Sequence, residues 1–249
     1  MQDITIADRF RCILTVSWFL LSLFVSTVVL IPVMALTLGR ARNFMIKYLG
    51  IFIGCTSLWV AGIRLNIRHV GTVPDRPAIY IFNHSSTVDL FILLSLGLEN
   101  IRFVAKREFQ FNPFFFILGN LTGQIFIPRG NSRRSVRILK KSYQRIVYNK
   151  LSVVMGPEGS RKHEGVIGPF KKGAFLMAVE LGYPIVPMYF ENASDLCRGQ
   201  SLITTKGTVT AYIHPAIDTS AWKKEDTVQN MKNVRRMYLT WAGVAEEAA

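Results

Sequence analysis

Apolar residues fill two long runs near the start of the chain and then recur only in short ones. Residues 13–38 carry no charge over 26 positions. As a helix this run would be about 39 Å long, enough to cross a hydrocarbon core of about 30 Å. The second run, residues 48–63, has 16 uncharged positions, which is short for a membrane span. We therefore expect an N-terminal pair of apolar helices over residues 1–67 and a separate domain over residues 68–249.

Basic residues flank both apolar runs. They are Arg9 and Arg11 before the first run, Arg40, Arg42 and Lys47 between the runs, and Arg64 and Arg68 after the second. Two spanning helices would place one of these groups on the side of the membrane that basic residues avoid. A monotopic hairpin, bent at Pro32 with every charge at one interface, avoids that conflict and is the arrangement we expect. Spanning helices are the alternative.

From Arg68 onward, short apolar runs alternate with helical patterns. We expect strands at residues 65–69, 78–82, 101–105, 124–127, 152–155, 185–190 and 208–213. We expect helices at residues 88–96, 113–118, 132–149, 172–181 and 227–241. This alternation is typical of an α/β domain with a mostly parallel central sheet flanked by helices.

Positive charge is in large excess. The 30 basic and 16 acidic residues give a net charge of +14, which predicts an anionic partner: a membrane surface, a phosphorylated substrate or nucleic acid. The helix expected at residues 132–149 carries six basic residues on one side, where the alternatives are a solvated face and contact with anionic lipid. The three cysteines and four histidines show no ligand spacing, so we expect no metal site.

The stretch NHSSTVD, Asn83 to Asp89, connects a predicted buried strand to a predicted helix. In one regular helix, His84 and Asp89 would diverge by about 140°. If Ser86 is the N-cap, Asp89 takes the third helical position and His84 lies in the turn, free to fold back on it. The carboxylate would then fix the imidazole tautomer and leave the other nitrogen free to accept a proton. The alternative is that Ser86 and Asp89 only cap a helix.

Two further stretches place an arginine just past a predicted strand. GQIFIPR ends at Arg129 and GPEGSR ends at Arg161. Ligands of open α/β sheets bind outside the carboxyl ends of the strands, so we expect His84, Arg129 and Arg161 to converge on one pocket. An arginine fork donates two parallel hydrogen bonds to a phosphate, and Glu158 would hold an arginine or a substrate hydroxyl.

Together these stretches resemble the four sequence blocks of the glycerolipid acyltransferases. NHSSTVD resembles the NHxxxxD block, GQIFIPR the second block, GPEGSR the PEGTR block and IVP, residues 185–187, the fourth. Their order and separations also match, so the resemblance covers residues 78–187. The N-terminal apolar hairpin is similar to that of bacterial 1-acylglycerol-3-phosphate acyltransferases.

The resemblance implies acyl transfer from a thioester, acyl-CoA or acyl-carrier protein, to the free hydroxyl of lysophosphatidic acid, with no other cofactor. His84 would be the general base and Asp89 would orient it. The residues that match acceptor-binding positions of the family are Lys106, Arg129, Glu158, Gly159, Ser160 and Arg161. The expected partners are an anionic membrane surface, the lysophospholipid and the acyl donor, without nucleic acid. The expected location is the inner membrane, with the catalytic domain on its cytoplasmic side.

Departures from the family pattern leave the acceptor open. Gly156 stands where phenylalanine is common, Ser160 replaces threonine, and Pro128 takes a position that is often acidic. Another lysophospholipid acceptor is therefore an alternative. From a different class, a non-catalytic lipid-binding protein at the membrane surface would use the basic face and need no general base. A serine nucleophile is disfavoured because the chain has no GxSxG elbow.

Overall fold

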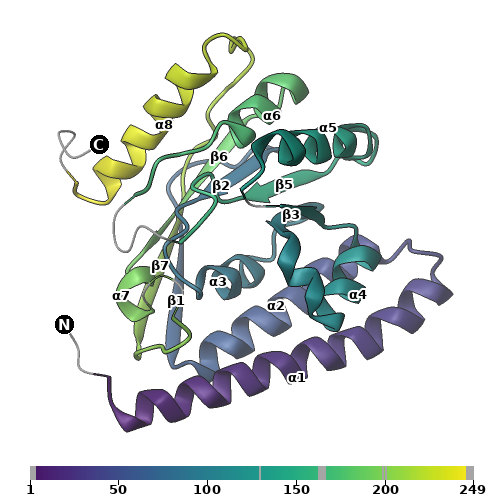
Figure 1. Cartoon of the computed structure of the whole chain (residues 1–249), viewed down its shortest axis with the longest axis vertical. Coiled ribbons are helices and arrows are strands. Elements are labelled where there is room, and N and C mark those ends of the chain that lie inside the picture. The colour runs from purple at the N-terminus through teal and green to yellow at the C-terminus, as the bar shows by residue number, and fades with distance from the viewer. Residues whose placement is uncertain (1–3, 129, 162–166, 198, 200, 245–249) are drawn as a thin grey trace.

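The computed structural model describes residues 4–128, 130–161, 167–197, 199 and 201–244 and is built around a seven-stranded sheet (Figure 1). The strands are β1 (Ile63–His69), β2 (Ile79–Phe82), β3 (Ile101–Lys106), β4 (Ile125–Ile127), β5 (Ser152–Met155), β6 (Ile185–Glu191) and β7 (Gly207–Ile213). Their order is β1-β7-β6-β2-β5-β3-β4, and every neighbouring pair is parallel except β6 and β7. The prediction of a mostly parallel sheet is confirmed.

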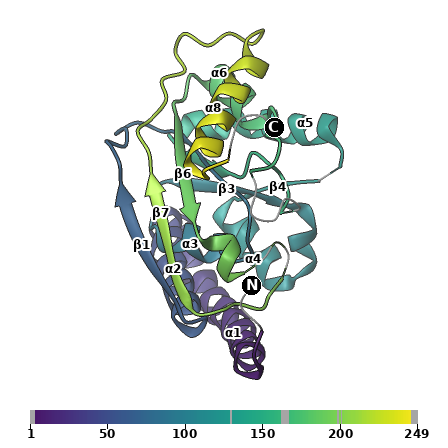
Figure 2. The same ribbon diagram turned by 90° about the vertical axis from the view of Figure 1, so that its left-hand side faces the viewer.

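Helices lie on both faces of this sheet (Figures 1 and 2). They are α1 (Ile6–Leu36), α2 (Arg42–Val60), α3 (Asp89–Ser95), α4 (Pro113–Thr122), α5 (Ser132–Tyr148), α6 (Gly173–Leu181), α7 (Ala193–Leu196) and α8 (Thr227–Trp241), with a 3-10 helix η1 (Arg107–Phe111). The predicted helices and strands are all present, and the structure adds η1 and α7. The predicted boundary at residue 67 falls inside β1, which joins the sheet from Ile63.

Strand β2 shows why the sheet needs cover on both faces. Tyr80 and Phe82 point into a core shared with α2 and α3, whereas Ile79 and Ile81 point into a second core formed with α5, α6 and α8. All four side chains are buried, so the strand is apolar at every position rather than at alternate ones. The end of β2, which leads into the NHSSTVD turn, is therefore held from both sides.

The two N-terminal helices pack along the lower side of the domain in Figure 1. Helix α2 lies against α3, and a Cβ at Gly54 would come within 2.6 Å of Phe91 O and Ser95 N, so only glycine permits this close crossing. The chain does not turn back at Pro32, where the hairpin was expected to bend, because α1 continues through Pro32 to Leu36. The chain instead reverses just after the helix, where Leu38 and Gly39 adopt positive φ angles of 50° and 76°.

The turn between α1 and α2 contacts the α/β domain. Arg102 Nη2 of β3 donates a hydrogen bond of 3.0 Å to Asn43 Oδ1 at the start of α2. The turn end of the hairpin is thus attached to the sheet through this bond. Its open end is attached through the direct connection of α2 to β1.

Candidate active site

His84 and Asp89 meet in the turn between β2 and α3. His84 Nδ1 lies 2.9 Å from Asp89 Oδ2, and the Asp89 side chain is fully buried while that of His84 is 16% exposed. Asp89 Oδ2 accepts a hydrogen bond from His84 Nδ1–H, which fixes the imidazole tautomer. Nε2 therefore carries no proton and is free to accept one. The predicted meeting of these side chains is confirmed.

The start of α3 differs in part from the prediction. Val88 already has helical φ and ψ angles of −66° and −22° and takes the N-cap position, so the helix begins at Asp89 rather than after Ser86. One of the two reciprocal bonds of a capping box is nonetheless present, because Asp89 Oδ2 accepts from Ser86 N–H at 3.0 Å. Ser86 Oγ accepts from Val88 N–H at 3.1 Å rather than from Asp89 N–H. Asp89 Oδ2 is therefore shared between the turn and the imidazole.

Asn83 fixes the other end of the same turn. Its amide donates to Phe190 O at 3.1 Å, and its Oδ1 accepts from Phe190 N–H at 2.7 Å. The side chain thus extends the pairing of β2 with β6 by one step. This role was not predicted from the sequence, since Phe190 lies 107 positions away and the only local signal is an amide directly after a strand.

Glu158 holds the backbone of His84 in place. The residue is 4% exposed, Oε1 accepts from His84 N–H at 2.9 Å, and Oε2 accepts from Gly168 N–H at 3.0 Å. Arg235 of α8, also missed from the sequence, donates to Gly168 O at 2.9 Å and Ile167 O at 3.0 Å. With both oxygens bound to backbone, Glu158 positions the turn, and no bond from an arginine to its carboxylate is among the described hydrogen bonds.

The environment of Glu158 makes stability depend on pH. Burial raises the pKa of Glu158 to about 7 from an ordinary 4.5, although the two backbone N–H groups oppose this shift. As the pH rises, the Glu158 carboxyl ionises at a lower pH in the unfolded chain than in the folded protein. The contribution of Glu158 to stability is therefore complete below pH 4.5 and is lost by about pH 7.

We expect wild-type protein to lose roughly 3 kcal/mol of stability relative to Glu158→Gln between these limits. Thermal unfolding of both proteins in detergent across this pH range checks the prediction, with Glu225→Gln on the surface as the control. A difference between wild type and Glu158→Gln that stays constant with pH would contradict it.

Arg161 is attached to the same turn. Its Nη1 donates to Thr87 Oγ1 at 2.7 Å, and Thr87 Oγ1 donates to Ser201 O at 2.7 Å. The segment after Ser201 reaches α1, because Cys12 Sγ donates to Leu202 O at 3.1 Å. Thr87, an unspecified position within NHxxxxD, therefore orients the arginine expected to bind phosphate and connects it to the N-terminal hairpin.

The glycines of GPEGSR allow close approaches. A Cβ at Gly156 would lie 3.1 Å from His84 Cβ, and a Cβ at Gly159 would lie 2.7 Å from Lys171 Nζ. Gly159 also has a φ of +69°, which disfavours other residues. The neighbouring Ser160 is half-buried.

Gly159→Ala is expected to displace Lys171 as well as strain the backbone. Gly182→Ala is the matched control, because Gly182 has a φ of +64° with nothing within 4 Å of its Cβ. Both variants should lose about 1–2 kcal/mol of stability, but only Gly159→Ala should lower acyl transfer, by about tenfold. Thermal unfolding and steady-state rates of the two proteins test this, and equal activity would show that the approach of Lys171 is unimportant.

The remaining predicted residues lie at the same edge of the sheet or outside the described residues. Lys106 ends β3, two strands from β2, with its Nζ 3.5 Å from Glu108 Oε1. No described interaction joins Lys106 to His84. Arg129 lies outside the described residues. The structure therefore brings together His84, Asp89, Glu158 and Arg161, with Lys106 at the same edge. Within the described residues, no group of three or more His, Cys, Asp or Glu side chains is placed to hold a metal ion.

Comparisons with known proteins show which family this chain is similar to. Residues 64–191 match a family model described as Acyltransferase. The chain is 33% identical over 166 residues to human 1-acyl-sn-glycerol-3-phosphate acyltransferase beta, covering 66% of this chain and 60% of that protein. It is 32% identical over 197 residues to the Limnanthes douglasii 1-acyl-sn-glycerol-3-phosphate acyltransferase, covering 76% of this chain and 67% of that protein.

The fold has a solved counterpart. The crystal structure of the 1-acyl-sn-glycerophosphate (LPA) acyltransferase PlsC from Thermotoga maritima superimposes with a TM-score of 0.73 at 22% identity, covering 95% of this chain and 96% of that one. The likeness includes the N-terminal helices, since so little of either chain is left out. From the matched family model and the Limnanthes relative, the chain belongs to the acyltransferase family that includes these 1-acyl-sn-glycerol-3-phosphate acyltransferases.

Proposed function

We propose that this protein transfers a fatty acyl group from a thioester to the free hydroxyl of lysophosphatidic acid and so forms phosphatidic acid. The observation that carries the proposal is the 2.9 Å contact of His84 Nδ1 with buried Asp89 Oδ2, at the carboxyl end of a central strand. The names of the similar human and Limnanthes proteins support lysophosphatidic acid as the acceptor. We propose no cofactor beyond the acyl donor.

The proposed reaction uses His84 as a general base. Nε2 takes the proton of the acceptor hydroxyl while that oxygen attacks the thioester carbonyl carbon. The tetrahedral intermediate then collapses, the carbon–sulfur bond breaks, and the leaving thiolate takes the proton from the imidazolium. Asp89 stabilises the imidazolium that exists between these steps. The products are the new ester and a free thiol, and the protein is unchanged.

Arg161 is proposed to bind the acceptor phosphate. Only Nη1 of its guanidinium is used in the described bond to Thr87, and the remaining donors suit phosphate oxygens. Lys106 at the same sheet edge, and Arg129 by the sequence resemblance, would complete the phosphate site. Ser160 and Gly159 would line it.

Two apolar helices and an exposed apolar surface support a position at a membrane. Both α1 and α2 are long and apolar enough to cross one, but α2 packs against α3 and the turn contacts β3, so spanning would carry the domain into the bilayer. We propose a monotopic hairpin instead. The exposed apolar residues form what we call the apolar underside: Ile6, Phe10, Ile13, Leu14, Leu20, Leu21, Phe24, Val25, Val28, Val29, Ile31, Leu36, Phe111 and Phe116.

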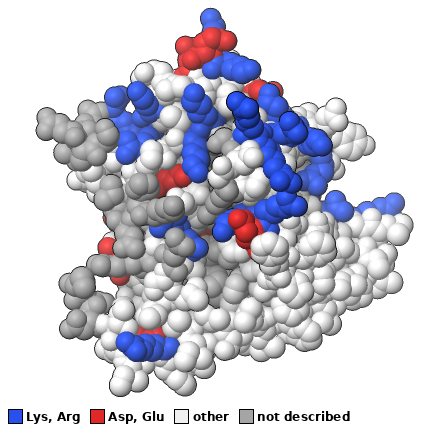
Figure 3. All heavy atoms as spheres, in the orientation of Figure 1, with Lys and Arg blue, Asp and Glu red and all other residues white. Residues whose placement is uncertain are grey.

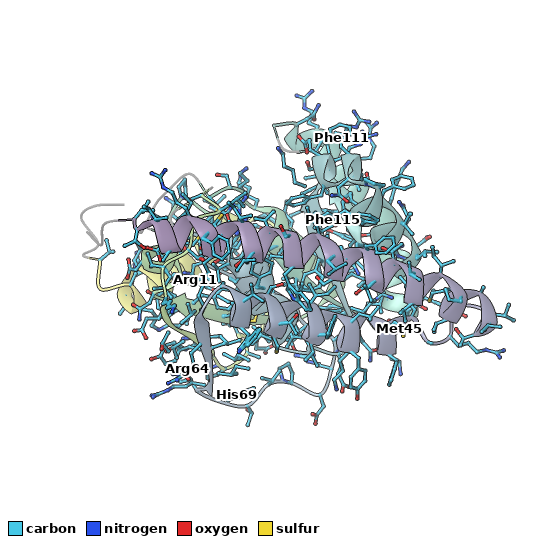
Figure 4. All side chains as sticks on the ribbon, turned by 90° about the horizontal axis from the view of Figure 1, so that it is seen from below. Arg11, Met45, Arg64, His69, Phe111 and Phe115 are labelled. Atoms are coloured by element: carbon cyan, nitrogen blue, oxygen red, sulfur yellow. The ribbon has the colours of Figure 1, made fainter. Side chains whose placement is uncertain are left out.

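The distribution of charge fits this placement. In Figure 3 the lower part of the molecule, formed by α1, is almost free of charge, and lysines and arginines gather in the upper part. Figure 4 shows Phe111 at the outer end of the η1–α4 region, away from α1, and Phe115 next to α1. The rings of Phe115 and Phe19 are 6.0 Å apart. The apolar underside would enter one leaflet. Helix α5 lies in the upper part, away from α1, so most of its basic face would meet solvent rather than the head groups of that leaflet (Figure 1). We propose the cytoplasmic side of the inner membrane as its location.

The hairpin proposal predicts the sidedness of the turn. With Cys12 and Cys55 replaced by serine, Arg40→Cys in the turn and Lys223→Cys in the α/β domain should react with an impermeant maleimide from the same side of sealed vesicles. Labelling from opposite sides would show that the helices span the membrane.

A panel of acceptors and donors tests the function. Purified protein in detergent is offered lysophosphatidic acid, lysophosphatidylglycerol and lysophosphatidylcholine, each with acyl-CoA and with acyl-carrier protein. Phosphatidic acid as the main product is the expected result, and the preferred donor identifies the co-substrate. A different phospholipid as the main product would identify a different acceptor. The absence of product in every combination would overturn the proposal of acyl transfer.

A further inference from the structure

Three arginines meet where the turn between α1 and α2 contacts the α/β domain. Arg42 begins α2, Arg102 is the second residue of β3, and Arg145 lies in the last turn of α5. A Cβ at Gly123 would lie 3.3 Å from Arg145 Nη1 and 3.6 Å from Arg102 Nε, so both guanidinium groups border one point. Arg42 adjoins Asn43, whose Oδ1 accepts from Arg102 Nη2 at 3.0 Å, so Arg42 lies at the same junction. Burial, and then the charge of Arg42, lowers the pKa of both other arginines, to about 10 for Arg102.

The described residues give these three charges only neutral partners. Arg102 is 3% exposed and donates to Ile101 O at 2.6 Å and to Asn43 Oδ1 at 3.0 Å. Arg145 Nη2 donates to Gly123 O at 2.9 Å. Arg42 Nε is buried and has no hydrogen-bond partner among the described residues, and no described ion pair involves any of the three. Arg102 is buried, Arg42 is half-buried and Arg145 is exposed. A buried arginine is normally paired with an anion, because an uncompensated buried charge is costly, so the charge of Arg102 most needs one.

The start of α2 adds positive charge at the same place. The helix is 19 residues long and begins at Arg42, and its N-cap residue Ala41 makes no side-chain hydrogen bond to the first turn. The N-terminus of a helix carries a partial positive charge, which favours anions and disfavours an arginine in the first turn. A cation here is therefore unfavourable unless an anion joins it.

We propose that Arg42, Arg102 and Arg145 form a binding site for a phosphate group, separate from the acyl-transfer site. Planar guanidinium forks from three directions suit the oxygens of a phosphate. The site lies at the opposite end of the strands from His84, since Arg102 pairs with Val153, which pairs with Ile79 at the start of β2.

A lipid head group is the source that the surroundings favour. Exposed apolar side chains stand on the same elements within a few residues of the arginines: Leu38 is 82% exposed, Phe44 61% and Tyr148 88%. These side chains would contact acyl chains while the arginines hold the phosphate, as amphipathic membrane surfaces do. A bound phosphate would also fasten the turn of the hairpin to β3 and α5. The other source of the same chemistry is free phosphate.

Thermal unfolding of the full chain in a neutral detergent tests for the site. Inorganic phosphate is titrated at constant ionic strength, set with chloride, into wild type, Arg42→Gln, Arg145→Gln and the exposed control Arg68→Gln. Phosphate should stabilise wild type and Arg68→Gln equally, and each site variant should bind about tenfold more weakly. Without phosphate, the site variants should melt at a higher temperature than wild type because repulsion is relieved.

Flotation with phosphatidylcholine vesicles, with and without phosphatidic acid, separates the two sources. If phosphatidic acid strengthens vesicle binding of wild type and Arg68→Gln more than that of Arg42→Gln and Arg145→Gln, the ligand is a lipid phosphate. If only inorganic phosphate distinguishes the site variants, the ligand is a free phosphate. If neither assay separates the site variants from Arg68→Gln, the proposal is wrong.

Discussion

Replacement of His84 by alanine is expected to lower kcat for acyl transfer about 10³-fold, within the range typical of a positioned general base. The acceptor KM should change little, since Arg161 is held by Thr87 and not by the imidazole. Initial rates of the purified variant with lysophosphatidic acid, at saturating donor, measure both quantities.

Two controls make the His84 result specific. His69→Ala, at an exposed position of β1, removes the same group elsewhere and should retain full activity. Vesicle flotation of His84→Ala should equal that of wild type, because the apolar underside is unchanged. Undiminished acyl transfer in a folded His84→Ala protein would favour the non-catalytic lipid-binding alternative or another base.

The site is stabilised mainly from outside its own motif. Glu158 holds His84 N–H, Asn83 holds Phe190, and Tyr238 of α8 donates to Ile81 O at 2.9 Å. Tyr238 is fully buried, so the last helix supports the strand that precedes His84. These contacts position the base without touching the expected substrate, and damage to α8 should therefore reduce activity as well as stability.

The sequence was sufficient to predict contacts between residues that are close together along the chain. His84 and Asp89 are five positions apart, and a turn followed by a helix limits where they can meet. Strands such as β2 were recognisable because burial on both faces makes every position apolar. The sequence also placed Arg161 near His84, through the rule that parallel strands gather their carboxyl ends.

Contacts between distant segments were not predictable in the same way. Glu158 was expected to face an arginine or substrate, yet it binds the backbone of His84, 74 positions away, and of Gly168. The arginines at positions 42, 102 and 145 belong to three separate elements, and no spacing rule relates them. The chain reverses at Leu38 and Gly39 rather than at Pro32, because residues with positive φ turn the backbone back, whereas a proline inside a helix at most kinks it.

Asp89→Asn is expected to lower kcat about 10²-fold, less than His84→Ala, because the turn should preserve the imidazole tautomer. Because Ser86 N–H donates to Asp89 Oδ2, an asparagine would place its side-chain oxygen at the Oδ2 position. That oxygen would still accept a hydrogen bond from His84 Nδ1–H. Its amide NH₂ would take the position of Oδ1, which is buried and has no partner among the described residues. Only the charge that stabilises the imidazolium is then lost, and a charge-assisted hydrogen bond is about twice as strong as a neutral one. Steady-state rates of Asp89→Asn and Asp89→Ala check this ordering: Asp89→Ala should be the slower, and equal rates would show that orientation of His84 does not depend on this bond.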